Sequence, residues 1–377
     1  MPDSPHLPTR HTLGYLLLTL TAITGEYPSA QVGRLPGGAY YKENVVKQLK
    51  REKLLRMFYR DGLRGLRLTA LAKSLLLQDQ PEQFLSYLTG STETNNLKSE
   101  VPRRLRLHRM AEVLTTMFNA GVLVFGPDKS PIFTDTPDLP IPLPAYYSSR
   151  ELKELGPLAV KVRGSRASGL LLTEGAIFAV YNTGPSLMKW EYQAEMRLKA
   201  LLQMELCNRR LSGQYRNAAI CGLVFGNSLD RLCGLMSSTP EQHHNYFILD
   251  GNYDAFYFLT SDHRGEVLLR LLCDPGLRAT LDTILCENLL PKRTGFPVEH
   301  DALEENGAPV LFAYTCDMPR IRHFDTALEL HGLSGTLICF DHQESALRQV
   351  CGARVQFQCI DFEKFERSVL HIKEETD

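Results

Sequence analysis

The sequence predicts a mixed fold of helices and sheets, α+β or α/β in class, that is divided into several domains. Its 377 residues exceed the roughly 100–200 residues of one ordinary domain, and 44% of them are hydrophobic. Six prolines between positions 127 and 144 disfavour a helix there and indicate an extended connector. Beyond this connector, short apolar runs alternate with helical ones, as is typical of layered α/β domains.

The net charge of −1 conceals a separation of charge along the chain. Residues 1–75 contain 12 Lys/Arg against 5 Asp/Glu, whereas residues 126–377 contain 25 against 33. The composition excludes gross disorder and a uniformly basic protein, because charged residues make up only 23% of the chain. A basic segment joined to a larger acidic one favours a polyanion as the partner of the basic segment.

The basic segment contains a compact series of short elements. They are predicted as helices over 13–24, 29–35 and 39–53, strands over 54–59 and 64–68, and a closing helix over 70–77. Arg60-Asp61-Gly62-Leu63 supplies the turn between the strands, and Thr69 can cap the closing helix. This order is that of a winged helix-turn-helix over residues 10–78, which a helical extension over 79–126 follows.

The third predicted helix is the candidate for reading DNA. Tyr41, Val45 and Leu49 recur at helical spacing and are expected to face the core. The opposite side then presents Tyr40, Glu43, Asn44, Lys47, Lys50 and Arg51. In the major groove, Asn44 suits adenine and Arg51 suits guanine. The predicted DNA-binding residues are Tyr40, Asn44, Lys47, Lys50, Arg51, Arg60, Arg64 and Arg67.

Phosphate neutralisation is the role expected of Lys47, Lys50, Arg60 and Arg64. The alternative is a winged helix that contacts only proteins, since a fold does not dictate a function.

The acidic part of the chain is predicted as a linker over 127–146 and an α/β domain over 147–377. A hairpin over 168–182 turns at Glu174-Gly175, and a long helix covers 186–207. The further predicted elements are strands over 218–225, 246–249, 255–260, 309–315, 335–340 and 355–360, with helices over 317–331 and 342–350.

This domain shows little catalytic chemistry in its sequence. A two-metal nuclease needs clustered carboxylates, yet the second arm of the hairpin contains none. Glu151-Leu-Lys153 falls on a predicted helix, and Glu191, Glu195 and Lys199 are interpreted as a helix-stabilising ladder. The histidine pair 243–244, His263 and His342 lack the spacing of a zinc site. We therefore expect no catalytic residue, metal or cofactor; the alternative is a nuclease whose acids converge from distant positions.

The chain resembles the replication-relaxation protein family of plasmids and integrative conjugative elements. The residues that match are the winged helix (10–78), Arg103-Arg104-Leu-Arg-Leu-His108, the stretch from Gly169 to Asn182, Lys189-Trp190 and Glu195. The resemblance implies a sequence-specific DNA-binding accessory protein in plasmid replication, DNA relaxation and transfer, or transcription control. It also implies that the second domain is a degenerate restriction-endonuclease-like fold or a partner platform.

Double-stranded DNA is the expected partner, and the resemblance adds a relaxase or a replication initiator. The sequence leaves open whether the chain forms a homodimer. The apolar run over 13–24 is too short to span a bilayer, which needs roughly 20 apolar residues, so we expect no membrane partner. The nine cysteines form no Cys-x-x-Cys pair, which favours reduced thiols and a cytoplasmic location.

Overall fold

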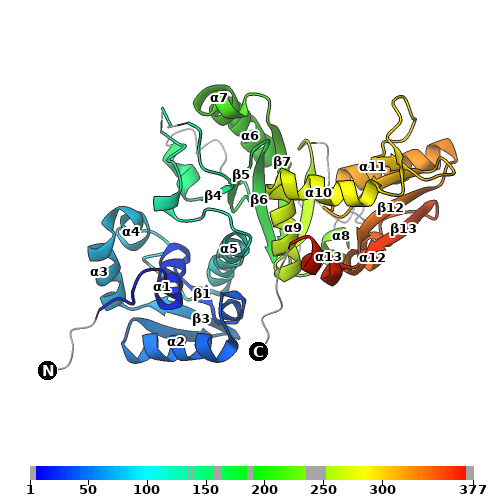
Figure 1. The fold of residues 1–377 in the computed structure, drawn as a ribbon. Coiled ribbons are helices and arrows are strands. Elements are labelled where there is room, and N and C mark those ends of the chain that lie inside the picture. Colours follow the sequence, from blue (N-terminus) through cyan, green and yellow to red (C-terminus); the bar gives the residue numbers. More distant parts are fainter. Residues whose placement is uncertain are drawn as a thin grey trace. The chain divides into compact units, whose positions relative to one another are not determined.

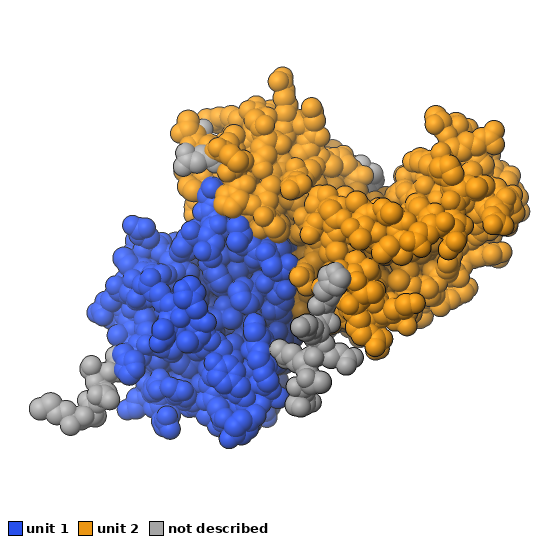
Figure 2. All heavy atoms as spheres, in the orientation of Figure 1, with its two compact units in different colours: residues 1–130 blue, residues 131–377 orange. Residues whose placement is uncertain are grey.

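A computed structural model describes residues 6–134, 136–137, 139–155, 164–184, 190–234 and 252–370 (Figure 1). The chain divides into two compact units, residues 1–130 and residues 131–377, which are coloured separately in Figure 2. Both units mix helices with sheets, and the described residues form three sheets in all. The predicted mixed class is confirmed.

Unit 1 begins with the elements of the basic segment. They are α1 (Leu13–Thr24), β1 (Tyr27–Pro28), the 3-10 helix η1 (Ser29–Arg34), α2 (Ala39–Arg51), β2 (Leu55–Arg60), β3 (Leu63–Leu68) and α3 (Ala70–Asp79). The antiparallel sheet has the order β1-β3-β2. Asp61 and Gly62 both have positive φ, 51° and 78°, as a two-residue hairpin turn of type I′ requires. The predicted hairpin and its turn are confirmed.

Helix α1 is buried on nearly all sides rather than on one face. The Thr12 hydroxyl caps its start by accepting a hydrogen bond from the Tyr15 N–H, and Gly25, at φ 79°, ends it. Helices α2, α4 (Pro81–Leu88) and α5 (Val101–Asn119) and strand β3 all contact it. A helix that is apolar all round is a central core helix in such surroundings.

The predicted helical extension is part of the same unit. It contains α4 (Pro81–Leu88), α5 (Val101–Asn119) and the short 3-10 helix η2 (Gly126–Asp128). Helix α5 contacts α1, β1 and η1 and buries Leu107, Ala111, Leu114 and Met117. The elements of residues 10–78 therefore share one core with α5.

The first sheet of unit 2 has the order β4-β5-β6-β7-β8. Its strands are β4 (Ala145–Ser148), β5 (Gly169–Leu172), β6 (Ala176–Gly184), β7 (Ala219–Gly226) and β8 (Phe256–Thr260). Strands β4, β5 and β6 are antiparallel neighbours, and β6, β7 and β8 are parallel. The connections contain α6 (Tyr192–Leu201), a π-helical segment (Leu202–Arg210), α7 (Ser212–Tyr215) and α8 (Leu229–Gly234).

The second sheet of unit 2 has the order β13-β12-β11-β10-β9, with β11, β12 and β13 parallel. Its strands are β9 (Leu290–Pro291), β10 (Ala302–Leu303), β11 (Pro309–Phe312), β12 (Gly335–Phe340) and β13 (Val355–Ile360). The helices are α9 (His263–Cys273), α10 (Pro275–Cys286), α11 (Met318–His331), α12 (Asp341–Leu347) and α13 (Phe362–Ser368). The two sheets meet where the Phe258 N–H donates to the Cys316 carbonyl at 3.2 Å.

Most predicted elements of unit 2 are confirmed. The hairpin of β5 and β6, strands β7, β8, β11, β12 and β13, and helices α11 and α12 lie at the predicted places. The strand over 246–249 falls outside the described residues, as do 186–189 of the predicted long helix. Its residues 190 and 191 are described and are not helical, and α6 begins at Tyr192.

The proline-rich segment is not a free spacer. Ile132, Phe133 and Ile141 are buried in unit 2, and Arg210 Nη1 donates to the Phe133 carbonyl at 2.5 Å. Strand β4, at its end, pairs with β5, which the sequence did not reveal. Apolar side chains between the prolines explain why this segment packs against unit 2 instead of forming the predicted connector. Their burial outweighs the tendency of prolines to form an extended spacer.

Candidate nucleic-acid interface

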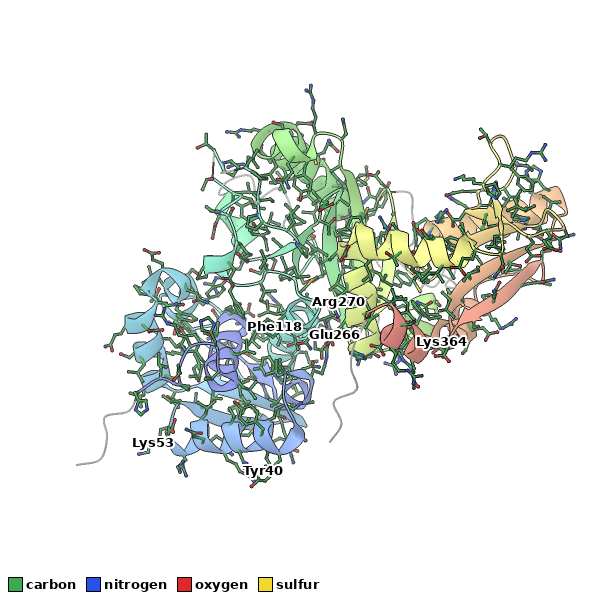
Figure 3. All side chains as sticks on the ribbon, in the orientation of Figure 1. Tyr40, Lys53, Phe118, Glu266, Arg270 and Lys364 are labelled. Atoms are coloured by element: carbon green, nitrogen blue, oxygen red, sulfur yellow. The ribbon has the colours of Figure 1, made fainter. Side chains whose placement is uncertain are left out.

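The outer side of α2 is exposed as predicted. Tyr40 is 77% exposed, Glu43, Lys47, Lys50 and Arg51 are also exposed, and Asn44 is half-buried. Tyr40 and Lys53, labelled in Figure 3, lie at the start of α2 and just beyond its end, and both point away from the rest of unit 1.

One residue on the predicted inner side of α2 is misplaced. Tyr41 is 50% exposed, while Leu49 is buried as predicted. The inward position is taken by Lys42, whose Nζ donates to the carbonyls of Gly33, at 2.8 Å, and Leu35, at 3.1 Å. Lys42 is half-buried, and its ammonium group satisfies the carbonyls of Gly33 in η1 and of Leu35 just beyond it, so Lys42 rather than Tyr41 packs at this end of α2.

Exposed cations gather on α2 and the hairpin. We call the exposed side chains of Lys47, Lys50, Arg51, Lys53, Arg56, Arg60 and Arg64 the basic surface. Glu43 and Asp61 are exposed on the same elements, where Glu43 pairs with Lys47 at 2.7 Å and Asp61 with Arg60 at 3.4 Å. Exposed ion pairs of this kind contribute little, about 0–1 kcal/mol, so both cations can exchange their partner for a phosphate.

The hairpin adds side chains that sequence analysis missed. Arg64 lies opposite Tyr59 in the register of β2 and β3, and its guanidinium carbon is 5.3 Å from the ring centroid. Tyr59 is 62% exposed, and Arg56 is exposed on the same strand. Strand alternation could have identified Tyr59 as a neighbour of Arg64, whereas it places Arg56 on the opposite face, across from Arg67.

Arg67 is not an interface residue, contrary to the prediction. Its side chain is 4% exposed and its Nη2 lies 2.5 Å from Glu26 Oε2. Its guanidinium carbon lies 3.7 Å from the centroid of the Phe58 ring. Strand alternation turns Arg67 away from the face of Arg64, and Arg67 Nη2 donates to the Lys98 carbonyl, 31 residues later in the sequence, at 3.1 Å.

Glu26, Arg67, Arg104 and His108 form a buried group that we call the Glu26 cluster. Glu26 Oε1 accepts from Arg104 Nη2 at 2.6 Å and lies 2.8 Å from His108 Nε2. Burial alone would raise the pKa of Glu26, but hydrogen bonds from His108, Arg104 and Arg67 outweigh it and lower the pKa to about 2. Gly65 makes room for this carboxylate, since a Cβ at position 65 would collide with it.

Glu195 of unit 2 is committed to hydrogen bonds inside the protein. Glu195 is fully buried and accepts from Ser165 Oγ at 2.8 Å, the Arg166 N–H at 2.8 Å and the Tyr181 hydroxyl at 2.7 Å. Burial raises its pKa. The predicted ladder of Glu191, Glu195 and Lys199 is therefore wrong, because Lys199 pairs instead with Asp254 at 2.9 Å.

The other candidate groups of unit 2 are also engaged. Glu151 Oε2 accepts from the Ser148 N–H at 2.7 Å, and Trp190 is buried beside Tyr181. His263 Nε2 lies 2.6 Å from Glu366 Oε1, and His342 stacks on Phe340.

No group of three metal-binding side chains occurs within the described ranges, and the histidine pair 243–244 lies outside them. No helix of the described part of the chain is long and apolar enough to cross a membrane.

Comparison with known proteins yields no match: no family model, no curated protein and no solved structure is similar to this chain.

Proposed function

We propose that this chain binds duplex DNA through α2 and the β2–β3 hairpin, with unit 1 acting as a winged helix-turn-helix. The basic surface is the observation that supports the proposal. These elements present seven exposed cations and two exposed acids. A helix followed by a two-stranded hairpin is the part of this fold that meets DNA, the helix in the major groove and the hairpin on the backbone.

The side chains divide into two roles. Asn44 and Arg51 on α2 suit base edges, and Tyr40 lies at the exposed start of the same helix. Lys47, Lys50, Arg60 and Arg64 suit phosphates, and Arg56 joins them from its exposed place on β2.

The biological role that we propose is that of a cytoplasmic, sequence-specific accessory protein of a mobile element. It would act in plasmid replication, DNA relaxation and transfer, or transcription control, with a relaxase or replication initiator as its protein partner. Unit 2 suits a partner platform or a degenerate nuclease-like domain, since its buried Glu195 and its Glu151 are committed to internal hydrogen bonds.

Fluorescence anisotropy of the full chain on a labelled duplex tests the proposal. With four to six phosphate contacts, log K falls with log salt at a slope of roughly −4 to −5 between about 50 and 200 mM. Lys50→Ala reduces the slope by about one. Arg270→Ala, at an exposed position of α9, is the matched control and leaves the slope unchanged.

Two experimental results would contradict this proposal and favour an alternative function. Binding that ignores salt, or no binding at all, favours a winged helix that contacts proteins alone. Cutting of supercoiled plasmid in the presence of Mg²⁺ or Mn²⁺ favours the nuclease.

A further inference from the structure

Arg104 connects α5 to the hairpin from inside unit 1. Its side chain is fully buried, and its guanidinium group donates to three backbone carbonyls of the hairpin. The distances are 3.3 Å to the Phe58 oxygen, 2.9 Å to the Arg60 oxygen and 3.1 Å to the Leu63 oxygen. These carbonyls lie on both sides of the Asp61-Gly62 turn.

This part of the hairpin has little other support. Strand β1 pairs with Leu66 and Gly65 of β3, and its pairing ends there, so residues 59–64 form a two-stranded ribbon. Ser29 Oγ also reaches the Arg64 carbonyl, at 3.4 Å and in an exposed position. A two-stranded ribbon is marginally stable by itself in water. Hydrogen bonds from the buried Arg104 side chain therefore hold the backbone of this ribbon.

The surroundings of Arg104 suit an arginine. The Glu26 carboxylate neutralises its charge, with contacts of 2.6 Å to Nη2 and 3.0 Å to Nε, and the Phe58 ring centroid lies 4.7 Å from its guanidinium carbon. A planar guanidinium with five N–H groups can serve the carboxylate and the carbonyls together, whereas a lysine ammonium has three donors and no plane.

We infer that Arg104 is a positioning residue for DNA: it holds the hairpin so that Arg60 and Arg64 reach phosphates. This inference rests on the proposed function, since it concerns the same surface. Arg104 itself is buried and touches no DNA. Its effect passes through the Arg60 and Leu63 backbone to the two exposed arginines on either side of the turn.

A double-mutant cycle on the full chain tests the inference. In the wild type, Arg64→Ala weakens binding to all duplexes roughly fivefold near 0.15 M salt and reduces the salt slope by about one. Arg104→Lys keeps the positive charge but loses the planar, forked set of N–H donors. This variant by itself should reduce the salt slope by about one to two. Adding Arg64→Ala to Arg104→Lys should then weaken binding by less than about twofold.

Two controls separate positioning from a general loss of structure. Arg51→Ala, on α2, should keep its full effect in the Arg104→Lys background, because α2 does not depend on the hairpin carbonyls. Ser29→Ala removes the exposed contact to the hairpin and should leave the effect of Arg64→Ala unchanged. If Arg104→Lys does not fold, Arg104→Gln is the second variant, since Glu26 keeps Arg67 as a partner.

Amide hydrogen exchange of the wild-type protein is a second test of the inference and requires no variant. The amides of Arg60 and Leu63 should exchange hydrogen as slowly as those of the core strands. Fast exchange there, or effects of Arg104→Lys and Arg64→Ala that simply add, overturns the inference while leaving DNA binding in place. A wild type that binds no duplex overturns the proposed function instead.

Discussion

At the scale of single residues, the proposed interface separates base reading from phosphate binding. Arg51→Ala should cost about 1–3 kcal/mol on the preferred duplex and relax the preference at one base pair. Arg64→Ala should weaken all sequences alike. Binding of both variants to specific and scrambled duplexes is the measurement. If Arg64→Ala alone changed sequence preference, the two roles would be wrongly assigned.

Glu26 predicts how the stability of the protein depends on acid. Its pKa is lowered from 4.5 to about 2 in the folded chain, so its contribution is complete above about pH 4.5 and disappears as the pH falls toward 2. Urea unfolding between pH 2 and pH 5 should therefore show a shallower pH dependence in Glu26→Gln than in the wild type, by up to about 1.4 kcal/mol per pH unit. Equal slopes would mean that folding does not lower the pKa of Glu26.

At the scale of elements, a histidine joins two helices of unit 2. His263, at the start of α9, lies 2.6 Å from Glu366 of α13 and 3.8 Å from Glu266. Interactions with Glu266 and Glu366 outweigh partial burial and raise the pKa of His263 to about 8. Because the folded pKa is raised, this contribution is complete below about pH 6.5 and is lost as the pH rises through 8.

NMR titration of His263 checks this link between α9 and α13. The wild-type imidazole should titrate near pH 8, and Glu366→Gln should move its pKa down toward 6.5. Amide exchange in α13, corrected for the intrinsic effect of pH, should rise above pH 8 in the wild type only. An unchanged titration in the variant would assign the raised pKa to Glu266 alone.

At the scale of the whole molecule, the division of charge follows the division of the fold. Residues 1–130 contain 18 Lys/Arg against 11 Asp/Glu, and residues 131–377 contain 24 against 32. The polyanion-binding unit that the charge pattern predicts is thus larger than the predicted winged helix, because it includes α4 and α5. Of the cations of α5, Arg104 is used inside this unit, whereas Arg103 and Arg106 are exposed and pair with Glu100 and Glu93.

A fragment of residues 1–130 should unfold cooperatively, whereas a fragment of residues 1–78 should not. The shorter fragment loses α5, which covers α1 and supplies Arg104 and Thr115, whose hydroxyl is hydrogen-bonded to the Tyr27 hydroxyl at 2.8 Å. A chain as short as residues 1–78 buries only a small hydrophobic core, so it cannot lose the contacts of α5 and stay stably folded. Thermal unfolding followed by circular dichroism compares the two. A cooperative transition in the shorter fragment would show that α5 is dispensable.

The sequence by itself determined the elements whose causes are local. The span of α1, the Asp61-Gly62 turn, the Thr69 cap and the hairpin of β5 and β6 follow from spacing, turn residues and capping groups within a few positions of one another. Counting charged residues likewise located the excess of positive charge in the N-terminal part of the chain.

Only the tertiary structure decided which charged side chains are available. Strand alternation puts Arg67 and Arg64 on opposite faces of β3, but only the structure shows that Glu26 and the Lys98 carbonyl bury the first and that the second is exposed. Lys42 replaced Tyr41 on the inner side of α2, and Glu195 found its partners on separate segments rather than on its own helix. Burial of a charge depends on neighbours that lie tens of residues away, and local periodicity contains no information about them.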